Sequence, residues 1–586
     1  MSKRLRLFSV LALVFLAGCG RTTTPIPPAS STSSQAASPI LSASPTPSQA
    51  ASPTNTVLPT PTPIVVGPGV GGPASTEGYP WWNDTVFYEI FVRSFYDSNG
   101  DGIGDFNGVT EKLDYLKDLG ITGLWLLPIH PSPTPVGYNA SDFYSVNPDY
   151  GSMDDFKRLL SGAHKRGIRV LIDRVLYDTS NQNPWFIASE DPNSPYRDWY
   201  FWSTTDRGPS IWGTPAWFKT PSGYYFSEFG QDVPHLNLNN PAVTAEVNKV
   251  SQFWLQDVGV DGFRVDSATN LIPEGRTLGD TASTHAWLKG FYTFYKGINP
   301  NAFTVGEVWK EPASSLATYI NGGQLDTTFE FNIAGAIIDS VQSGSNSKIN
   351  ATLQQAFTII PHQQFAPFIT NHDMDRAMTM MNDDPEKAKA AASLLLTSPG
   401  VPFIYFGEEI GMQGKYKDAN GGWLVQNLDY PMQWSSEKNA GFSVGSPWFQ
   451  VNPNYLQINV SDEMKDPTSL FSHYKALIGL RNAHPALRIG SLNIVSSSNS
   501  GLFASLRVSS TEAMLVLINL TNTPINNFSL SLDKSPLQSG KYLALPLMGQ
   551  GPVGDLNVIS TGVFSNYDPI PTIPAYATVI IQFDPK

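Results

Sequence analysis

Between Val86 and about residue 488, apolar positions follow two patterns that alternate along the chain. Short apolar runs typical of buried strands lie at residues 123–128 and 169–173. Between such runs lie stretches such as residues 153–166, whose apolar side chains recur with the spacing of one helical face. This alternation predicts parallel strands that are joined by helical crossovers.

The same alternation continues well past the middle of the chain. Further strand candidates are residues 262–266, 303–308, 327–331, 366–370 and 403–406. Helical stretches at 242–256 and 385–396 lie between them. About 400 residues of this pattern suit an eight-stranded α/β barrel with insertions, which we place at residues 77–487. Residues 178–240 are rich in Trp, Tyr, Pro and Ser and interrupt the pattern, so we expect an irregular inserted subdomain there.

The pattern changes again after about residue 488. The apolar or alternating runs in this region are residues 502–508, 513–520, 528–532 and 577–583. No helical spacing separates these runs, and such a series is typical of antiparallel strands. We therefore predict a separate C-terminal β-sandwich at residues 488–586.

The N-terminus carries a different signal. Lys3, Arg4 and Arg6 precede an apolar run at residues 7–17, which is too short for a membrane-spanning helix and suits a secretion signal. The run ends in Leu-Ala-Gly-Cys at residues 16–19, which resembles the cleavage box of bacterial lipoproteins. The resemblance implies a signal peptide at residues 1–19, lipidation of Cys19 and an extracytoplasmic location on a bacterial membrane. The alternative is a plain secretion signal with an accidental cysteine.

A linker is predicted between this signal and the barrel, at residues 20–76. Residues 21–66 contain 10 Pro, 9 Thr and 9 Ser, and no acidic residue appears before Glu77. A segment of this composition buries too little apolar surface to fold, and its prolines keep it extended. It reads as a disordered stalk.

Charge and cysteine content exclude several classes of partner and site. The 586 residues include one cysteine, which excludes a disulfide scaffold and a cysteine-based zinc site. The net charge of −13 argues against nucleic acid or an anionic membrane surface as the main partner. We expect a monomer that contacts a membrane only through its lipid.

Polar residues gather where three of the predicted strands end. Asp266 and Glu307 end two strands, Asp373 follows a third, and Arg264 and His372 lie beside them in sequence. In a barrel of this type the chemistry lies at the carboxyl ends of the strands. A single carboxylate there is most often a helix cap, but three with an arginine and a histidine indicate a catalytic cleft. Carboxylates about 5 to 5.5 Å apart would suit retaining glycoside cleavage.

Five stretches resemble the α-amylase family, glycoside hydrolase family 13, in order and spacing. They are Gly-Phe-Arg-Val-Asp at 262–266, Gly-Glu-Val-Trp at 306–309, Phe-Ile-Thr-Asn-His-Asp at 368–373, Gly-Tyr at 137–138 and Pro-Phe-Ile-Tyr-Phe-Gly-Glu-Glu at 402–409. The resemblance implies a (β/α)8 TIM barrel with an inserted B domain and a C-terminal β-sandwich. It also implies an enzyme that cleaves α-1,4-glucosidic bonds of starch or maltooligosaccharides with retention of configuration.

The resemblance also assigns catalytic roles. Asp266 would be the nucleophile that forms a glycosyl-enzyme, and Glu307 would protonate the leaving oxygen and then activate water. Asp373 would hold the distorted sugar through its hydroxyls.

Four further residues would contact the substrate or the nucleophile. Arg264 would fix and ionise Asp266, His372 would bind sugar hydroxyls, and Tyr138 would stack against the sugar. The fourth is Asp178. The family carries Asn-His where this chain has Tyr177 and Asp178, and the family's His binds the sugar at the cleavage point. A carboxylate at Asp178 would be a fourth acid near the nucleophile and should raise neighbouring pKa values.

The loop at residues 97–105 predicts a structural calcium site. It carries oxygen donors at alternate positions, and hard oxygen donors suit calcium. An EF-hand is excluded because its twelfth position is Gly108 rather than Glu. The resemblance implies these ligands: the side chains of Asp97, Asn99, Asp101 and Asp105, and the carbonyl of Ile103. A second calcium site of the family is expected to be absent, because Tyr177 and His235 replace its Asn and Asp.

Weaker clues concern substrate preference. Exo-acting relatives clamp a terminal glucose with an Asp and an Arg, and the corresponding residues here are Pro135 and Asp429. Ser267 follows the nucleophile where α-1,6-specific relatives tend to carry Val. Together these favour an endo-acting α-1,4 amylase. The alternatives are a glucanotransferase, a neopullulanase, an α-glucosidase or a non-catalytic glucan-binding lipoprotein.

Overall fold

The computed structural model describes residues 76–586 apart from 211–212, 310, 418–424, 550 and 561. The predicted signal peptide, the lipidation site at Cys19 and nearly all of the linker lie outside the described residues. Across the described residues, no helix is long and apolar enough to cross a membrane.

An eight-stranded, all-parallel sheet forms the centre of the fold, which confirms the predicted barrel. Its strands are β1 (Phe87–Ile90), β2 (Gly123–Leu126), β3 (Arg169–Arg174), β7 (Gly262–Val265), β8 (Phe303–Gly306), β9 (Thr327–Phe329), β10 (Phe365–Ala366) and β11 (Phe403–Tyr405). They pair in the order β10-β9-β8-β7-β3-β2-β1-β11. The Val401 N–H, just before β11, donates to the carbonyl of Phe365 in β10 at 2.9 Å, which brings these two strands together and closes the barrel.

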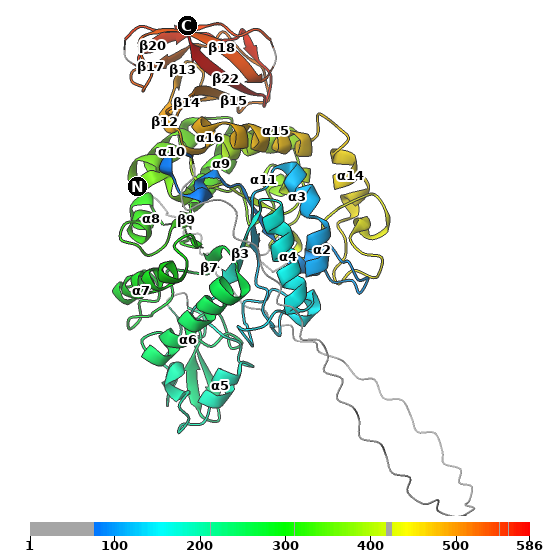
Figure 1. Ribbon diagram of the computed structural model, residues 1–586, viewed down its shortest axis with the longest axis vertical. Coiled ribbons are helices and arrows are strands. Elements are labelled where there is room, and N and C mark those ends of the chain that lie inside the picture. The colour runs from blue at the N-terminus through cyan, green and yellow to red at the C-terminus, as the bar shows by residue number, and fades with distance from the viewer. Residues whose placement is uncertain (1–75, 211–212, 310, 418–424, 550, 561) are drawn as a thin grey trace, which may run out of the picture. The chain divides into compact units, whose positions relative to one another are not determined.

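Helices surround these strands (Figure 1). The longer ones are α2 (Phe106–Glu111), α3 (Leu113–Leu119), α4 (Met153–Lys165), α6 (Pro241–Gln252), α7 (Ala282–Ile298), α8 (Ala313–Ile320), α9 (Phe331–Ser343), α10 (Ser347–Ile359), α12 (Pro385–Thr397) and α15 (Leu470–Ala483). Their starts follow ordinary capping rules: α4 begins with a capping box of Ser152 and Asp155, and Asp384 caps α12 ahead of Pro385. The predicted helix at 242–256 is α6, which continues as a π-helical turn at Phe253–Val258.

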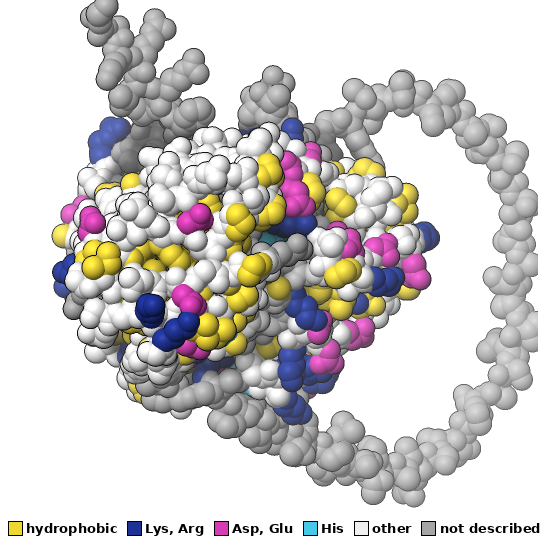
Figure 2. All heavy atoms as spheres, turned by 90° about the horizontal axis from the view of Figure 1, so that it is seen from above, with side chains coloured by type: hydrophobic (Ala, Val, Ile, Leu, Met, Phe, Trp, Pro, Cys, Tyr) yellow, Lys and Arg dark blue, Asp and Glu magenta, His cyan; other side chains and the backbone are white. Residues whose placement is uncertain are grey.

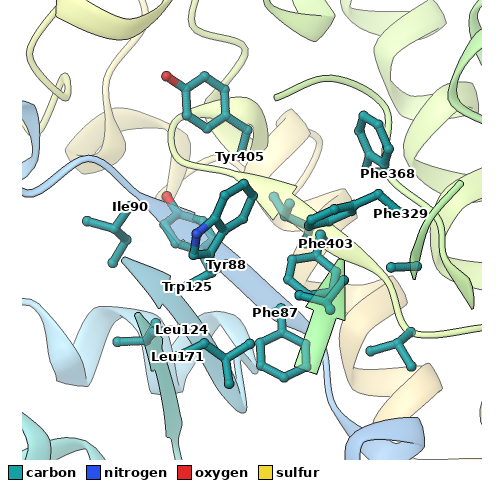
Figure 3. Packing of buried hydrophobic residues seen from close by; sticks show 14 of the residues in the cluster. Phe87, Tyr88, Ile90, Leu124, Trp125, Leu171, Phe329, Phe368, Phe403 and Tyr405 are labelled. Atoms are coloured by element: carbon teal, nitrogen blue, oxygen red, sulfur yellow. The ribbon is translucent and has the colours of Figure 1, made fainter. Parts of the chain in front are cut away.

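Aromatic side chains fill the barrel interior (Figure 3). Phe87 of β1 stacks on Phe403 of β11 with ring centroids 4.6 Å apart, and Phe329 of β9 packs against Phe403 at 4.9 Å. The strands approach closely around Gly262, where a Cβ atom would lie 1.9 Å from the Phe303 carbonyl oxygen. Only glycine fits the start of β7, which carries Arg264 and leads directly into Asp266.

The first described residues cover the amino ends of the strands. The Trp81 indole donates to the Asn301 carbonyl, just before β8, and packs under the Arg169 guanidinium at the start of β3. The Trp82 indole donates to Gln364, just before β10. The chain therefore enters the barrel at the end opposite the predicted site.

The insertion after β3 is more regular than predicted. It contains α5 (Pro184–Ser189) and a three-stranded sheet, β4 (Trp202–Ser203), β5 (Trp217–Thr220) and β6 (Gly223–Phe226), in the order β4-β6-β5. Its strands are short and rich in Trp, Tyr and Phe, so the aromatic composition that marked an irregular segment also builds a sheet.

Antiparallel sheets make up the C-terminal region, as predicted. The larger one has the order β12-β14-β15-β22-β18-β19, and a three-stranded sheet has the order β13-β17-β20. The bounds are β12 (Ser491–Ile494), β13 (Ser496–Ser497), β14 (Leu502–Val508), β15 (Ala513–Asn519), β17 (Leu530–Leu532), β18 (Gly540–Met548), β19 (Leu556–Val558), β20 (Phe564–Tyr567) and β22 (Thr578–Pro585). The longest strand, β18, was not predicted. It contains Pro546, and the register with β22 shifts between Pro546 and Met548.

Candidate active site

The three predicted catalytic carboxylates lie where barrel strands end. Asp266 follows β7, Glu307 follows β8, and Asp373 lies in the segment after β10. Their side chains are 15%, 3% and 30% exposed, respectively. Glu307 is therefore enclosed, while Asp266 and Asp373 are open to a ligand.

A single guanidinium joins two of these carboxylates. In Arg264, Nη1 lies 2.6 Å from Oδ1 of Asp266, and Nη2 lies 2.7 Å from Oε2 of Glu307. Nη1 also donates to Asp173 at 3.0 Å, and the guanidinium packs over the Trp125 ring. The nucleophile and acid candidates thus lie within the span of one planar cation.

Burial sets the protonation preferences of this group. Burial raises the pKa of Asp266 to about 8, against the opposing effect of Arg264, and Glu307 and Asp173 raise it further as like charges. Burial alone would lower the pKa of Arg264, but the surrounding carboxylates, Asp173 first, raise it well above its usual value. Arg264 is therefore a permanent cation beside a carboxyl group, that of Asp266, which ionises only at a pH well above its usual pKa.

The backbone also holds Glu307. The Ser267 N–H donates to Oε2 of Glu307 at 3.0 Å, and Ser267 has a positive φ of 37°. This left-handed turn directly after β7 aims the N–H across to the end of β8.

His372 links the barrel interior to Asp373. Its Nδ1 lies 2.5 Å from Oε1 of Glu89, a buried residue of β1, and its Nε2 lies 3.2 Å from Oδ2 of Asp373. Burial opposes the charged imidazole, yet Asp373 and Glu89 together raise the pKa of His372 to about 9. His372 is therefore a cation at neutral pH, with an N–H on both sides.

Tyr138 lies beside these residues as the motif predicted, and its hydroxyl joins the network. It donates to Oδ2 of Asp173 at 3.1 Å and lies 2.8 Å from Nε2 of His372. Its ring lies nearly parallel to the His372 ring, with centroids 5.9 Å apart. The ring is half-buried, which leaves part of it free for contact with a sugar.

Tyr416 is a site residue that the sequence did not indicate. The Tyr416 hydroxyl donates to Oδ1 of Asp373 at 3.2 Å, and the Tyr416 backbone N–H donates to Asp375 at 2.7 Å. Asn427 further fixes this segment by donating to the carbonyls of His372 and Met374. No motif marks Tyr416, because it comes from a loop more than forty residues further along the chain.

Glu89 and Asp173 were also missed as site residues, although the sequence carries a signal for each. Each is the acidic residue within an otherwise apolar strand run, at residues 86–91 and 170–173. A buried carboxylate in such a run requires a partner. The partners are His372 for Glu89 and Arg264 for Asp173.

Asp178 lies at the entry to the insertion and is 2% exposed. Its Oδ1 is 3.6 Å from Nδ1 of His235, and an isolated antiparallel bridge joins the two residues. The Tyr177 ring packs against the His235 ring with centroids 4.9 Å apart. The two residues that replace family calcium ligands, Tyr177 and His235, are thus in contact with each other.

In the predicted calcium loop, side-chain oxygens at alternate positions accept hydrogen bonds from the backbone of the loop itself. Asp97 accepts from the Asn99 N–H, Asn99 from the Asp101 N–H and Asp101 from the Ile103 N–H, at 3.1, 2.8 and 2.8 Å. Within residues 76–586 as described, no three His, Cys, Asp or Glu side chains form a group able to hold a metal ion. A metal here would depend also on the Asn99 amide and the Ile103 carbonyl, a mixed oxygen set that fits calcium.

Asp105, the last predicted ligand, has a structural role as well. It caps α2 by accepting from the Gly108 N–H at 2.7 Å, and it accepts from the Ser98 N–H at 2.9 Å. This fixes the loop at both ends.

Comparison with known proteins agrees with this geometry. The α-amylase catalytic-domain family matches residues 89–490. Alpha-amylase 3 of Dictyoglomus thermophilum is 36% identical over 461 residues, which cover 77% of this chain and 87% of the relative. An oligo-1,6-glucosidase of Parageobacillus thermoglucosidasius is 33% identical over 515 residues, covering 76% and 91% of the two chains.

Solved structures show the same relationship. The crystal structure of an α-amylase from H. orenii is 34% identical, with a TM-score of 0.73, covering 85% of this chain and 99% of that one. Trehalulose synthase from Pseudomonas mesoacidophila is 30% identical, with a TM-score of 0.73, covering 86% and 100%. With its barrel, its strand-end carboxylates and these relatives, the chain belongs to the α-amylase family of glycoside hydrolases, family 13, whose members hydrolyse or transfer α-glucosyl units.

Proposed function

We propose that this protein is a retaining α-glucan hydrolase that cleaves internal α-1,4 bonds of starch or maltooligosaccharides. The observation that carries the proposal is the position of Asp266 and Glu307 on two nitrogens of the Arg264 guanidinium. Both carboxyl groups contact the same guanidinium, an arrangement compatible with the short carboxyl separation of retaining enzymes, and this supports the double-displacement route.

In this mechanism Asp266 attacks the anomeric carbon and forms a glycosyl-enzyme bond while Glu307 protonates the departing glycosidic oxygen. Glu307 then takes a proton from water, which attacks the same carbon and releases Asp266. The enclosed position of Glu307, 3% exposed, suits a group that must deliver a proton directly to the leaving oxygen.

Asp373, His372 and Tyr138 would bind the sugar at the cleavage point. The charged His372 offers N–H donors to hydroxyls, and Asp373, the most exposed of the three carboxylates, accepts from them. Asp178 would form part of the wall beside Asp266.

The α-1,4 endo preference rests on the relative named alpha-amylase and on two replaced clamps. Pro135 and Asp429 stand where exo-acting relatives pin a terminal glucose, so longer chains should pass through the cleft. Other relatives are named oligo-1,6-glucosidase and trehalulose synthase. Because of them, α-1,6 cleavage and glucosyl transfer are the alternative activities for this protein.

The test is the time course of product sizes from starch and from defined maltooligosaccharides. Early fragments of mixed, intermediate length support an endo-amylase. Glucose alone would replace the proposal with an exo-glucosidase, and products longer than the substrate would replace it with a transferase. An Asp266→Asn variant should release no sugar while still binding glucan, and if the wild-type protein also only binds glucan, the protein is not an enzyme.

We also propose a metal ion, a location and a partner for the enzyme. A single calcium ion in the loop at 97–105 would be structural, and the cleavage box at Cys19 supports a lipid anchor on the outside of a bacterial membrane. Figure 2 shows basic and acidic side chains interspersed on one face of the molecule, and the net charge of −13 argues against nucleic acid as the main partner. α-Glucan is the partner, and a monomer is the expected state.

A further inference from the structure

Backbone hydrogen bonds fix Asp178 and His235 opposite each other. The Leu236 N–H donates to the Tyr177 carbonyl at 2.6 Å, and the Thr179 N–H donates to the Pro234 carbonyl at 3.1 Å. These bonds flank the two residues, which makes them a non-hydrogen-bonded antiparallel pair. In such a pair the side chains lie on the same face and close together.

Both residues are buried, and aromatic rings surround His235. Asp178 is 2% exposed and His235 is 0% exposed. The His235 ring lies 4.9 Å from the ring of Tyr177, 5.8 Å from that of Phe201 and 5.2 Å from that of Phe226, measured between centroids. An apolar enclosure of this kind makes an unbalanced charge costly.

The contacts of His235 assign its protons. Its Nε2 lies 3.2 Å from the Leu271 carbonyl, which can only accept, so Nε2 carries a hydrogen. In the neutral ring Nδ1 is then an acceptor. Nδ1 faces Oδ1 of Asp178, and neither atom has another hydrogen-bond partner among the described residues. Two acceptors that face each other at 3.6 Å in a buried site repel each other, and a proton on one of them removes that repulsion.

The neighbours of Asp178 are acids. Buried Glu228, which accepts from Asn270 at 2.8 Å, and the nucleophile candidate Asp266 are the charged groups that act on it. Burial first, then Glu228 and Asp266, raise the pKa of Asp178 well above its usual value, and burial lowers the pKa of His235 to about 4. Both directions agree with a proton that stays with the carboxyl.

We propose that Asp178 is protonated beside a neutral His235, so that the two residues form a net-neutral positioning pair in the wall beside Asp266 and add no negative charge there. A fourth charged carboxylate would push the ionisation of Asp266 to higher pH, so that less of the nucleophile would be ionised at a given pH. In the neutral pair, the carboxyl group at Asp178 carries no charge and therefore does not raise the pKa of Asp266. The kinetic consequence rests on the proposed function, whereas the proton count of the pair does not.

The first experiment reads the protonation state of His235 in the full-length protein labelled with 15N-histidine. A His235→Asn variant identifies the His235 signals. The ring nitrogens of His235 should keep constant chemical shifts from pH 5 to pH 8, because the pair neither takes up nor releases a proton there. A His235 titration inside that range would overturn the proposal. This readout stands even if no glucan is cleaved, so it separates this proposal from the proposed function.

The second experiment reads the charge through catalysis. In Asp178→Asn the side chain is uncharged, as Asp178 is in the proposed pair. The acidic limb of the pH profile of kcat/KM should therefore stay where it is in the wild type. A limb that moves down by roughly one pH unit or more would mean that the variant removed a negative charge beside Asp266, and the proposal would be wrong. Asp206→Asn, which removes an exposed charge of the same insertion, is the matched control and should leave the limb in place. If Asp178→Asn does not fold, the histidine spectrum of the wild type decides.

Discussion

The Ser267 N–H donates to Oε2 of Glu307 at 3.0 Å from a left-handed backbone with φ of 37°. The residue after the nucleophile thus orients the acid on the neighbouring strand. Non-glycine residues rarely adopt this conformation, and they do so where the surrounding structure imposes it.

Two substitutions at Ser267 distinguish the role of its backbone, with positive φ and a free N–H to donate, from the role of its side chain. Ser267→Pro should lower the free energy of unfolding by about 3 kcal/mol or more and abolish activity, because proline has no N–H and fixes φ near −65°. Ser267→Gly keeps the N–H and tolerates positive φ, so it should retain most of the wild-type kcat. Urea unfolding and initial rates on starch check both. A proline variant as active as the glycine variant would show that this hydrogen bond is dispensable.

The acidic limb of kcat/KM should have its midpoint well above pH 4. Asp266 must be ionised to attack, and burial raises its pKa to about 8 from an ordinary value of about 3.9. Activity is therefore lost as pH falls through the raised pKa of the free enzyme. His372, with a pKa of about 9, stays charged over this range and adds no limb of its own. A midpoint near pH 4 would contradict the buried position of Asp266.

Asp266→Asn should be more stable than the wild type at pH 7. The folded state holds the Asp266 proton more tightly than the unfolded chain does, so the free energy of unfolding falls as pH rises from about 4 towards 8. Asparagine removes this dependence. Thermal unfolding at pH 4 and pH 7 should show a gain that is present at pH 7 and absent at pH 4. An equal gain at both values would point to packing rather than charge.

Tyr416→Phe should lower kcat/KM about tenfold, which corresponds to a hydrogen bond worth roughly 1.4 kcal/mol. The lost hydroxyl donates to Asp373, so the effect should appear mainly in kcat if it orients that carboxylate in the transition state. Tyr542→Phe is the control, because its hydroxyl donates to the Gln538 carbonyl in the C-terminal region. Equal rates for Tyr416→Phe and the wild type would remove Tyr416 from the site.

Chelation should lower the melting temperature through the loop at 97–105. A ligand that binds only the folded state at a hundredfold excess over its Kd contributes about 2.7 kcal/mol. Asp101→Ala should melt at the lower temperature with or without EDTA, because it lacks one of the proposed calcium ligands. An unchanged melting temperature of the wild type in EDTA would exclude the calcium site.

The barrel was predictable because its strands are short, apolar and separated by helical spacing. Predicted strands such as 169–173 and 403–406 differ from β3 and β11 by one residue at the carboxyl end. The sheet of the insertion and β18 were not predictable in the same way. Pro546 argues against a strand, and the register shift that accommodates it depends on the neighbouring strand.

The site was predictable where its residues belong to one strand end. Arg264 and Asp266 lie two residues apart, so a local pattern reveals both. Tyr416 and the contact of Asp178 with His235 join segments far apart in the sequence, and only the folded chain brings them together. The contact of Asp178 with an imidazole also changes the charge expected at this position, since the sequence alone indicates one more negative charge.

The cover formed by Trp81 and Trp82 over the amino ends of the strands has a practical consequence. Whatever is attached before Thr76 joins the enzyme on the side away from Asp266, Glu307 and Asp373. Immobilisation through the N-terminus, on a bead or an electrode, should therefore leave the substrate entrance unobstructed, whereas coupling through lysines at random should not.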